Sequence, residues 1–348
     1  MLIVLAGAAR ADTLRIATYN PAMKRQGPGL LLRDLQKTDD PAIASAVQVI
    51  VALRADVLLL TGFDYDLDQV ALKALSGQLA ASGLTYPYLF SARPNTGMRT
   101  DLDLDADGKL GGPGDAQGYG RFSGEGGMAI LSRLPIRQSE VRDFSSFLWR
   151  DLPGALLFDG MTPQAKDVQR LSTTAHWDVP IDLPGGQVLH LLAWAATPPV
   201  FDGVEDRNGR RNHDEAAFWN ALLDGTLPMA PPEPPFVVLG DANLDTADGD
   251  GIADAMLRLM AHPALQALSP KGASGRVEPS QKGDPEMDTA DYSANNGPGG
   301  LRVEYILPSR DLQITGAGVM WPNAGDPLSQ VLATASRHRP VWVDIELP

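Results

Sequence analysis

Four polar positions stand out because their side chains suit divalent-metal or proton-transfer chemistry. Asn20, Asp241 and Asn243 each follow an apolar run, and His338 lies close to the C-terminus. Carboxylate oxygens are the ligands that Mg²⁺ prefers, and an imidazole can act as a general base. Asp241 and Asn243 are either site residues or the polar end of a strand, and a lone histidine is more often structural. These four residues are candidates for a functional site.

The organisation of the chain favours a layered α/β protein, because short apolar runs alternate with amphipathic segments. We expect a helix to begin at Pro41, after the cap candidates Asp39 and Asp40. The dense basic cluster at 207–211 is interpreted as a surface loop or a wall of the site, the loop being the commoner case. The segments expected to be strands are 14–19, 57–60, 128–131, 188–194, 236–239, 303–307 and 341–345, and those expected to be helices are 41–53, 67–79 and 213–223.

Five sequence blocks occur in a fixed order along the chain: RIATYN at 15–20, DVLLL at 56–60, GMAILSRLPI at 127–136, VVLGDAN at 237–243 and SRHRPV at 336–341, the last after RVEYILPS at 302–309. Together they resemble the endonuclease/exonuclease/phosphatase superfamily, which includes deoxyribonucleases, abasic-site endonucleases, sphingomyelinases and inositol polyphosphate phosphatases. The stretches 197–203 and 207–215 are similar to a bacterial, often secreted branch. The resemblance implies an α/β (α+β) fold, a four-layer sandwich of two mixed β-sheets flanked by helices, with the site at the sheet edges.

The resemblance also implies roles for individual positions. In this superfamily a Glu that ends the second block holds a divalent metal with the Asn of the first block, here Asn20. Asp241 and Asn243 match the residues that orient the nucleophile, and His338 matches the histidine of a final Asp-His pair. Three positions depart from the pattern: Gly62 stands where the metal-binding Glu is expected, Ala195 where a phosphate-binding His is expected, and Arg337 in place of the final Asp.

These departures predict a catalytically degenerate protein, a pseudoenzyme with the fold of a metal-dependent phosphoesterase. Glycine and alanine offer no side chain to a metal or a phosphate, and Arg337 is expected to favour the neutral imidazole of His338. The alternative is an active phosphoesterase that acts with Mg²⁺ or Mn²⁺ on a small or lipid phosphoester. Asp64 would then join Asn20 and Asp241 at a shifted metal site, because residues two apart share one face of a strand.

A third alternative is a calcium-binding exported protein. Asp103, Asp105 and Asp107 are spaced like the first half of an EF-hand-type calcium loop, but the bidentate Glu at the twelfth position is absent. Calcium binding and an ordinary solvated turn are equally compatible with this pattern.

Composition limits the classes of partner and cofactor. The chain has 348 residues, and 29 Lys and Arg against 43 Asp and Glu give a net charge of −14, which disfavours nucleic acid as a partner. With no cysteine, disulfides and thiolate metal sites are excluded.

Residues 1–11 resemble the end of a truncated secretory signal, so we expect export to the periplasm or medium, and we assign 12–348 to one domain. No other apolar run is long enough to span a bilayer. The ligand and the oligomeric state cannot be predicted from the sequence.

Overall fold

Two β-sheets face each other at the centre of the computed structural model, which describes residues 13–105, 107–294 and 297–347. One sheet has six strands in the order β12-β13-β1-β2-β4-β3, and the other has five in the order β11-β8-β7-β6-β5. A separate two-stranded ribbon pairs β9 with β10. The strands are β1 (Thr13–Tyr19), β2 (Val57–Phe63), β3 (Tyr88–Phe90), β4 (Gly127–Ser132), β5 (Arg142–Asp143), β6 (Ala175–Asp182), β7 (Val188–Ala195), β8 (Phe236–Asp241), β9 (Ala290–Asp291), β10 (Gly300–Leu301), β11 (Glu304–Pro308), β12 (Ile314–Val319) and β13 (Val341–Glu346).

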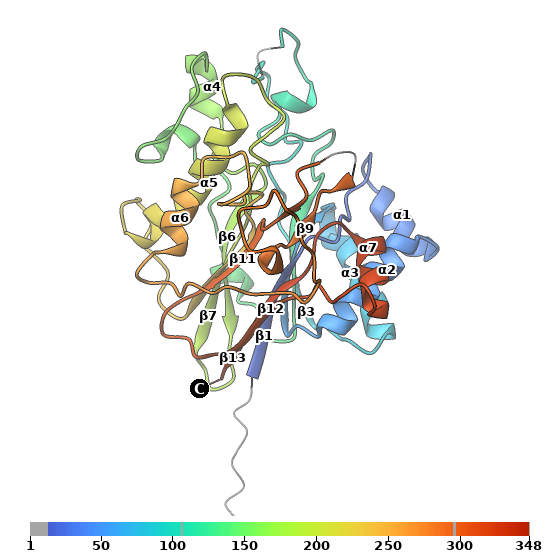
Figure 1. Cartoon of the computed structure of the whole chain (residues 1–348). Helices are drawn as coiled ribbons and strands as arrows, with labels where there is room; N and C mark the ends of the chain where they lie inside the picture. The colour runs from blue at the N-terminus through green and yellow to red at the C-terminus, as the bar shows by residue number, and fades with distance from the viewer. Residues whose placement is uncertain (1–12, 106, 295–296, 348) are drawn as a thin grey trace, which may run out of the picture.

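Helices cover the outer face of each sheet, which gives the four layers expected from the sequence (Figure 1). The helices are α1 (Leu30–Lys37), α2 (Pro41–Leu53), α3 (Val70–Ala81), α4 (Pro163–Val168), α5 (Arg207–Leu223), α6 (Asp254–Met260) and α7 (Pro327–Ala335). Helices α1, α2, α3 and α7 pack on the six-stranded sheet, and α5 and α6 pack on the five-stranded sheet. The predicted mixed α/β sandwich is therefore confirmed.

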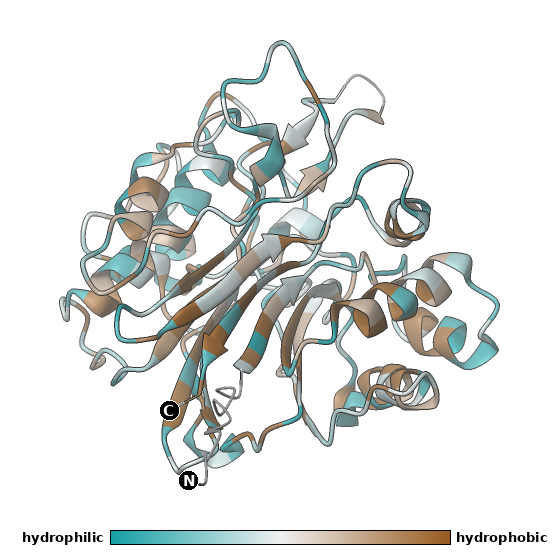
Figure 2. Ribbon diagram, turned by 60° about the horizontal axis from the view of Figure 1, so that its bottom comes forward, coloured by the Kyte–Doolittle hydropathy of each residue, from teal (hydrophilic) through white to brown (hydrophobic). Residues whose placement is uncertain are grey.

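The core between the sheets consists of inward-facing residues of both. Ile16, Val57 and Leu59 of the first sheet and Val237 and Leu239 of the second are fully buried in one cluster. Hydrophobic residues are frequent along the central strands (Figure 2), and the buried apolar residues of the helices pack against the sheets. Because this core fixes the two sheets against each other, residues that follow their strand ends are held at set positions.

Local signals explain where several elements begin. The Asp40 carboxylate accepts hydrogen bonds from the N–H groups of Ala42 and Ile43, and Pro41 occupies the first turn, so α2 spans the predicted 41–53. The α-helix expected from 67 begins only at Val70, after a short 3-10 turn.

Helix α5 corrects the interpretation of the basic cluster 207–211. The helix starts at Arg207, six residues before the predicted start, so the cluster is helical rather than a loop. The Arg211 side chain is buried and donates to the carbonyls of Gln117, Arg170, Leu171 and Ser172. The Arg211 guanidinium therefore links these loops through hydrogen bonds inside the protein.

The predicted signal segment 1–11 lies outside the described residues. Within the described part of the chain, no helix combines the length and the apolar character that crossing a bilayer requires.

Candidate functional site

Asp241 and Glu304 lie directly opposite each other across two antiparallel strands. Asp241 ends β8 and Glu304 begins β11, and the register pairs these two residues. On the other side of β8, Asp241 is level with Ala195, the last residue of β7. Cross-strand partners in an antiparallel pair place their side chains on one face, so the two carboxylates are brought together by strand register.

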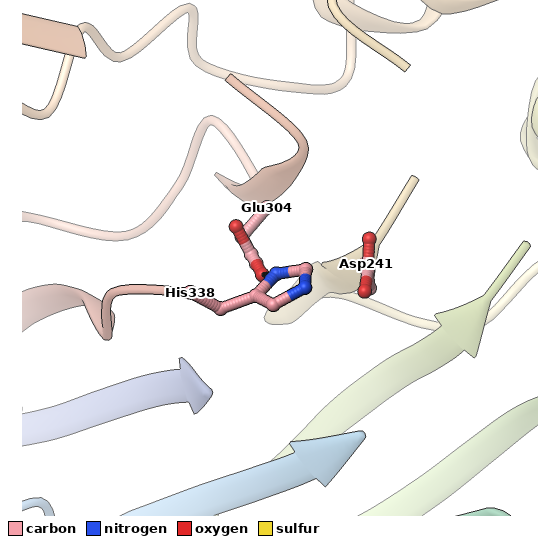
Figure 3. A group of neighbouring side chains, drawn as sticks. All are labelled: Asp241, Glu304 and His338. Atoms are coloured by element: carbon pink, nitrogen blue, oxygen red, sulfur yellow. Dashed lines mark hydrogen bonds and ion pairs between the residues drawn. The ribbon is translucent and has the colours of Figure 1, made fainter. Parts of the chain in front are cut away.

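Glu304 also contacts His338, which arrives from the segment between α7 and β13. One carboxylate oxygen of Glu304 is hydrogen-bonded to Nδ1 of His338. The imidazole ring lies between the carboxylates of Glu304 and Asp241, and one ligand atom from each residue lies within 4.8 Å of the others (Figure 3). All three side chains are buried. The sequence around Glu304 predicts only a strand, and no local signal there indicates this role.

Thr289 positions Glu304 through the backbone. Its hydroxyl oxygen accepts hydrogen bonds from the N–H groups of Val303, at 2.8 Å, and Glu304, at 3.0 Å. Ser336 plays a matching part on the other side, because its hydroxyl donates to the carbonyl of Asn20 and accepts from the N–H of His338. The segment carrying His338 is thereby fixed to the end of β1.

The predicted residues Asn20 and Asn243 both contact Asp241. Asn20 Nδ2 donates to Asp241 Oδ2 at 3.1 Å, and the N–H of Asn243 donates to Oδ1 at 3.0 Å. The side-chain amide of Asn243 donates to the carbonyl of Ala196 and thus faces the end of β7. The structure therefore brings together the four residues selected from the sequence, Asn20, Asp241, Asn243 and His338, and adds Glu304.

Burial controls the electrostatics of this group. Burial raises the pKa of Asp241 to about 6, the Glu304 charge adds to the rise, and the hydrogen bonds from Asn20 and Asn243 oppose it. For His338, burial disfavours the charged ring, but the Glu304 carboxylate outweighs this effect and raises the pKa. Arg337 acts in the expected direction and favours the neutral ring, but the carboxylates of Glu304 and Asp241 outweigh it, so the net pKa is raised.

The resemblance places a metal-binding Glu at position 62, where this chain has a glycine. Gly62 has a φ of +60°, and a Cβ built on it would lie 2.4 Å from Asn20 Oδ1. That oxygen already accepts a hydrogen bond from the N–H of Ala22. A longer side chain at position 62 has room only if Asn20 moves, so position 62 offers no carboxylate to an ion.

Ala195 and Arg337 are the other two positions that depart from the superfamily's site pattern. Ala195 is buried at the end of β7 among residues of the inter-sheet core. Arg337 is exposed, and its guanidinium lies over the ring of Tyr292, 5.3 Å from the centroid. The side chain that stands in place of an expected carboxylate thus packs against a loop beside the site.

Asp64 is held apart from this group by local hydrogen bonds. A register shift between Leu60 and Phe63 interrupts β2, so the alternation that placed Asp64 on the same face as Gly62 ends there. The Asp64 carboxylate accepts from the N–H groups of Arg25 and Gly126. Burial raises its pKa to about 6. It does not belong to the described carboxylate and histidine group around Asp241.

The acidic loop gathers a different set from the one predicted. Asp103 and Asp105 lie with Asp115, one oxygen of each within 4.8 Å of the others. Asp107 is outside this group, and its carboxylate accepts from the N–H of Lys109. The Asp115 carboxylate is itself hydrogen-bonded to the N–H groups of Leu104 and Gly112.

The group of Asp241, Glu304 and His338 differs from the position at Gly62, because it offers two carboxylates and an imidazole. Glu304 Oε2 is buried and has no hydrogen-bond partner among the described residues. This donor set is chemically compatible with a cation, and Glu304 can equally serve to orient the ring of His338.

Fold and site together define a class: two-sheet α/β sandwiches whose polar site lies where strand ends of both sheets meet. A sequence profile of the Endonuclease/Exonuclease/phosphatase family matches residues 33–338, so the chain belongs to this family. No curated protein sequence matches the chain significantly.

Solved structures share the fold. An endonuclease/exonuclease/phosphatase from Beutenbergia cavernae aligns with a TM-score of 0.57 at 19% identity, over 97% of this chain and 72% of that one. Sphingomyelinase C from Streptomyces griseocarneus gives 0.51 at 15% identity, over 96% and 99%. The beta toxin of Staphylococcus aureus with bound magnesium ions gives 0.51 at 15% identity, over 95% and 99%. At these identities the likeness establishes the fold.

Proposed function

We propose that this protein is a catalytically degenerate member of its family, which binds a phosphoester-like ligand without the family's metal-dependent hydrolysis. The observation that carries the proposal is the contact between Gly62 and Asn20. Position 62 has no carboxylate, and a side chain there would fit only if Asn20 moved. A cation that polarises the phosphoryl oxygens is central to such hydrolysis, and its loss is not made good by a base alone.

The remaining residues support binding and orientation. Glu304 fixes the ring of His338 through Nδ1, which leaves Nε2 directed away from that carboxylate. Asp241 is held by Asn20 and by the N–H of Asn243. Such a set can present a defined imidazole to a ligand, but it has no phosphate-binding side chain at Ala195.

The direct test is a phosphoesterase assay with bis(p-nitrophenyl) phosphate and p-nitrophenyl phosphate, in Mg²⁺, Mn²⁺ or EDTA. We expect the rate of the natural protein to equal that of Asp241→Ala in every condition. Turnover that requires Mg²⁺ or Mn²⁺ and disappears in Asp241→Ala would overturn the proposal.

That second outcome would favour an active divalent-metal phosphoesterase on a small or lipid phosphoester. The close grouping of Asp241, Glu304 and His338 is the observation in its favour. Because one protein of the same fold is a sphingomyelinase C, sphingomyelin vesicles are a suitable additional substrate.

The calcium-binding alternative depends on Asp103, Asp105 and Asp115, whose carboxylates lie close together. A melting temperature that rises with Ca²⁺ in the natural protein but not in Asp105→Ala would support it. Asp101→Ala, an exposed carboxylate of the same loop, is the matched control.

We further propose that the protein is exported, on the basis of the apolar run 1–11 that ends in Ala-Arg-Ala. Fractionation of cells that express the chain, compared with cells that express a chain begun at residue 12, tests this. Recovery of both proteins in the cytoplasm would contradict export.

A further inference from the structure

Arg337 presents a guanidinium with no acidic partner beside the site. In the described part of the chain, no carboxylate lies within ion-pair distance of it, and the side chain is exposed. Its backbone is nevertheless fixed, because the carbonyl of Arg337 accepts a hydrogen bond from the N–H of Asp291 in β9 at 2.9 Å. An anchored arginine with open donors is suited to an anionic group with several oxygens.

Tyr292 stands between this guanidinium and His338. Its ring meets the imidazole edge-on, with centroids 5.9 Å apart and planes at 84°. Its hydroxyl is 3.5 Å from His338 Nε2, the long limit of a hydrogen bond, so the hydroxyl remains able to donate to a better acceptor. The bridge between Ala290 and His338 and the bond from Tyr292 N–H to the Gly299 carbonyl hold this loop in place.

The charges of Asp241 and Glu304 act on Tyr292, and each carboxylate has a donor of its own, although Glu304 Oε2 has none among the described residues. Glu304 is bonded to His338, and Asp241 accepts from Asn20 and from the N–H of Asn243. Relative to the site that the family pattern implies, a Glu and an Asp are missing and an arginine is added. These two changes make the local charge less negative.

We infer that the Arg337 guanidinium and the Tyr292 hydroxyl form a metal-independent subsite for a tetrahedral oxyanion, namely phosphate or the phosphoryl group of a monoester. The planar guanidinium pairs with two phosphate oxygens, and the phenol donates to a third. His338, held by Glu304, positions Tyr292. This inference rests on the proposed function, because it names the ligand chemistry of the same site.

The test is calorimetric titration of the full chain with inorganic phosphate in EDTA at low ionic strength. Arg337→Gln is expected to weaken binding about 10-fold or more, as is usual when a charge-assisted hydrogen-bonding partner is lost. Arg337→Lys should lie between this variant and the natural protein, because it keeps the charge without the planar fork. Tyr292→Phe should cost several-fold.

Arg54→Gln is the matched control. Arg54 is also an exposed arginine, but it follows α2 at the opposite end of the six-stranded sheet, before β2 begins. The affinity of this variant for phosphate should equal that of the natural protein. Circular dichroism spectra confirm that each variant is folded before it is titrated.

The absence of binding in EDTA, or equal affinity of Arg337→Gln and Arg54→Gln, would overturn the inference. This outcome is distinct from failure of the proposed function, which is metal-dependent turnover lost in Asp241→Ala. A protein that hydrolyses phosphoesters yet binds phosphate in EDTA through Arg337 would retain the subsite and lose the assignment as degenerate.

Discussion

Gly62 and Asn20 are in contact at the junction of the first two family strands, where a Cβ on Gly62 would lie 2.4 Å from Asn20 Oδ1. Asn20 is in turn bonded to Asp241. Asn20 can therefore keep its present position only while position 62 has no side chain, and the hydrogen bond from Asn20 to Asp241 depends on that position.

Gly62→Ala should consequently lower stability more than an alanine at a comparable glycine. Gly83 has a similar left-handed φ of +86°, and a Cβ added there would have no atom within 4 Å, so Gly83→Ala should cost only about 1–2 kcal/mol of backbone strain. Gly62→Ala adds crowding against Asn20, which typically costs a further ~1–3 kcal/mol. Urea unfolding of both variants measures the difference, and equal losses would mean that Asn20 moves aside freely.

Reversion of the three departures tests the cause of the proposed degeneracy. We expect the variant Gly62→Glu/Ala195→His/Arg337→Asp to gain Mg²⁺-dependent hydrolysis of bis(p-nitrophenyl) phosphate relative to the natural protein, while it loses stability at position 62. Gly62→Glu alone is the control and should show the loss of stability without the gain. A folded triple variant with no gain in turnover would show that other features cause the inactivity.

Thr289 offers a way to perturb Glu304 without touching it. Thr289→Val keeps the shape but leaves the buried N–H groups of Val303 and Glu304 without their acceptor, and each such loss costs about 1–3 kcal/mol. Thr334→Val on the exposed face of α7 should change the free energy of unfolding by no more than about 0.5 kcal/mol. Denaturant unfolding compares the two, and a neutral Thr289→Val would argue against this anchoring role.

His176 should make the protein less stable in mild acid. Burial lowers its pKa to about 4 from 6.5, opposed by the hydrogen bond to the Glu215 carbonyl. The folded state therefore prefers the neutral ring, and stability that is complete above pH 6.5 is lost as the pH falls toward 4.

Between pH 6.5 and about 5 this single group should remove roughly 2 kcal/mol from the free energy of unfolding. His176→Gln should lack that loss, so the pH dependence of the two proteins should be parallel above pH 6.5 and diverge below it. Curves that remain parallel throughout mild acid would contradict the shift.

Local sequence patterns were enough to predict much of the fold. Alternating apolar runs located the central strands, and Asp40 with Pro41 located the start of α2. These signals depend on side-chain periodicity and on capping groups within a few residues, so they can be read without knowledge of distant contacts. The prediction of a surface loop at 207–211 is wrong, because the local sequence does not reveal that Arg211 is buried among the carbonyls of distant loops.

The resemblance of five sequence blocks to the superfamily predicts Asn20, Asp241, Asn243 and His338 as site residues and marks the departures at Gly62, Ala195 and Arg337. How these residues combine depends on contacts between distant parts of the chain. The register of β11 against β8 places Glu304 opposite Asp241, and His338 comes from a segment 34 residues beyond Glu304. Strand pairing and loop packing bring such residues together across long stretches of chain, so no local pattern encodes the contact, the raised pKa of His338 or the approach of Tyr292.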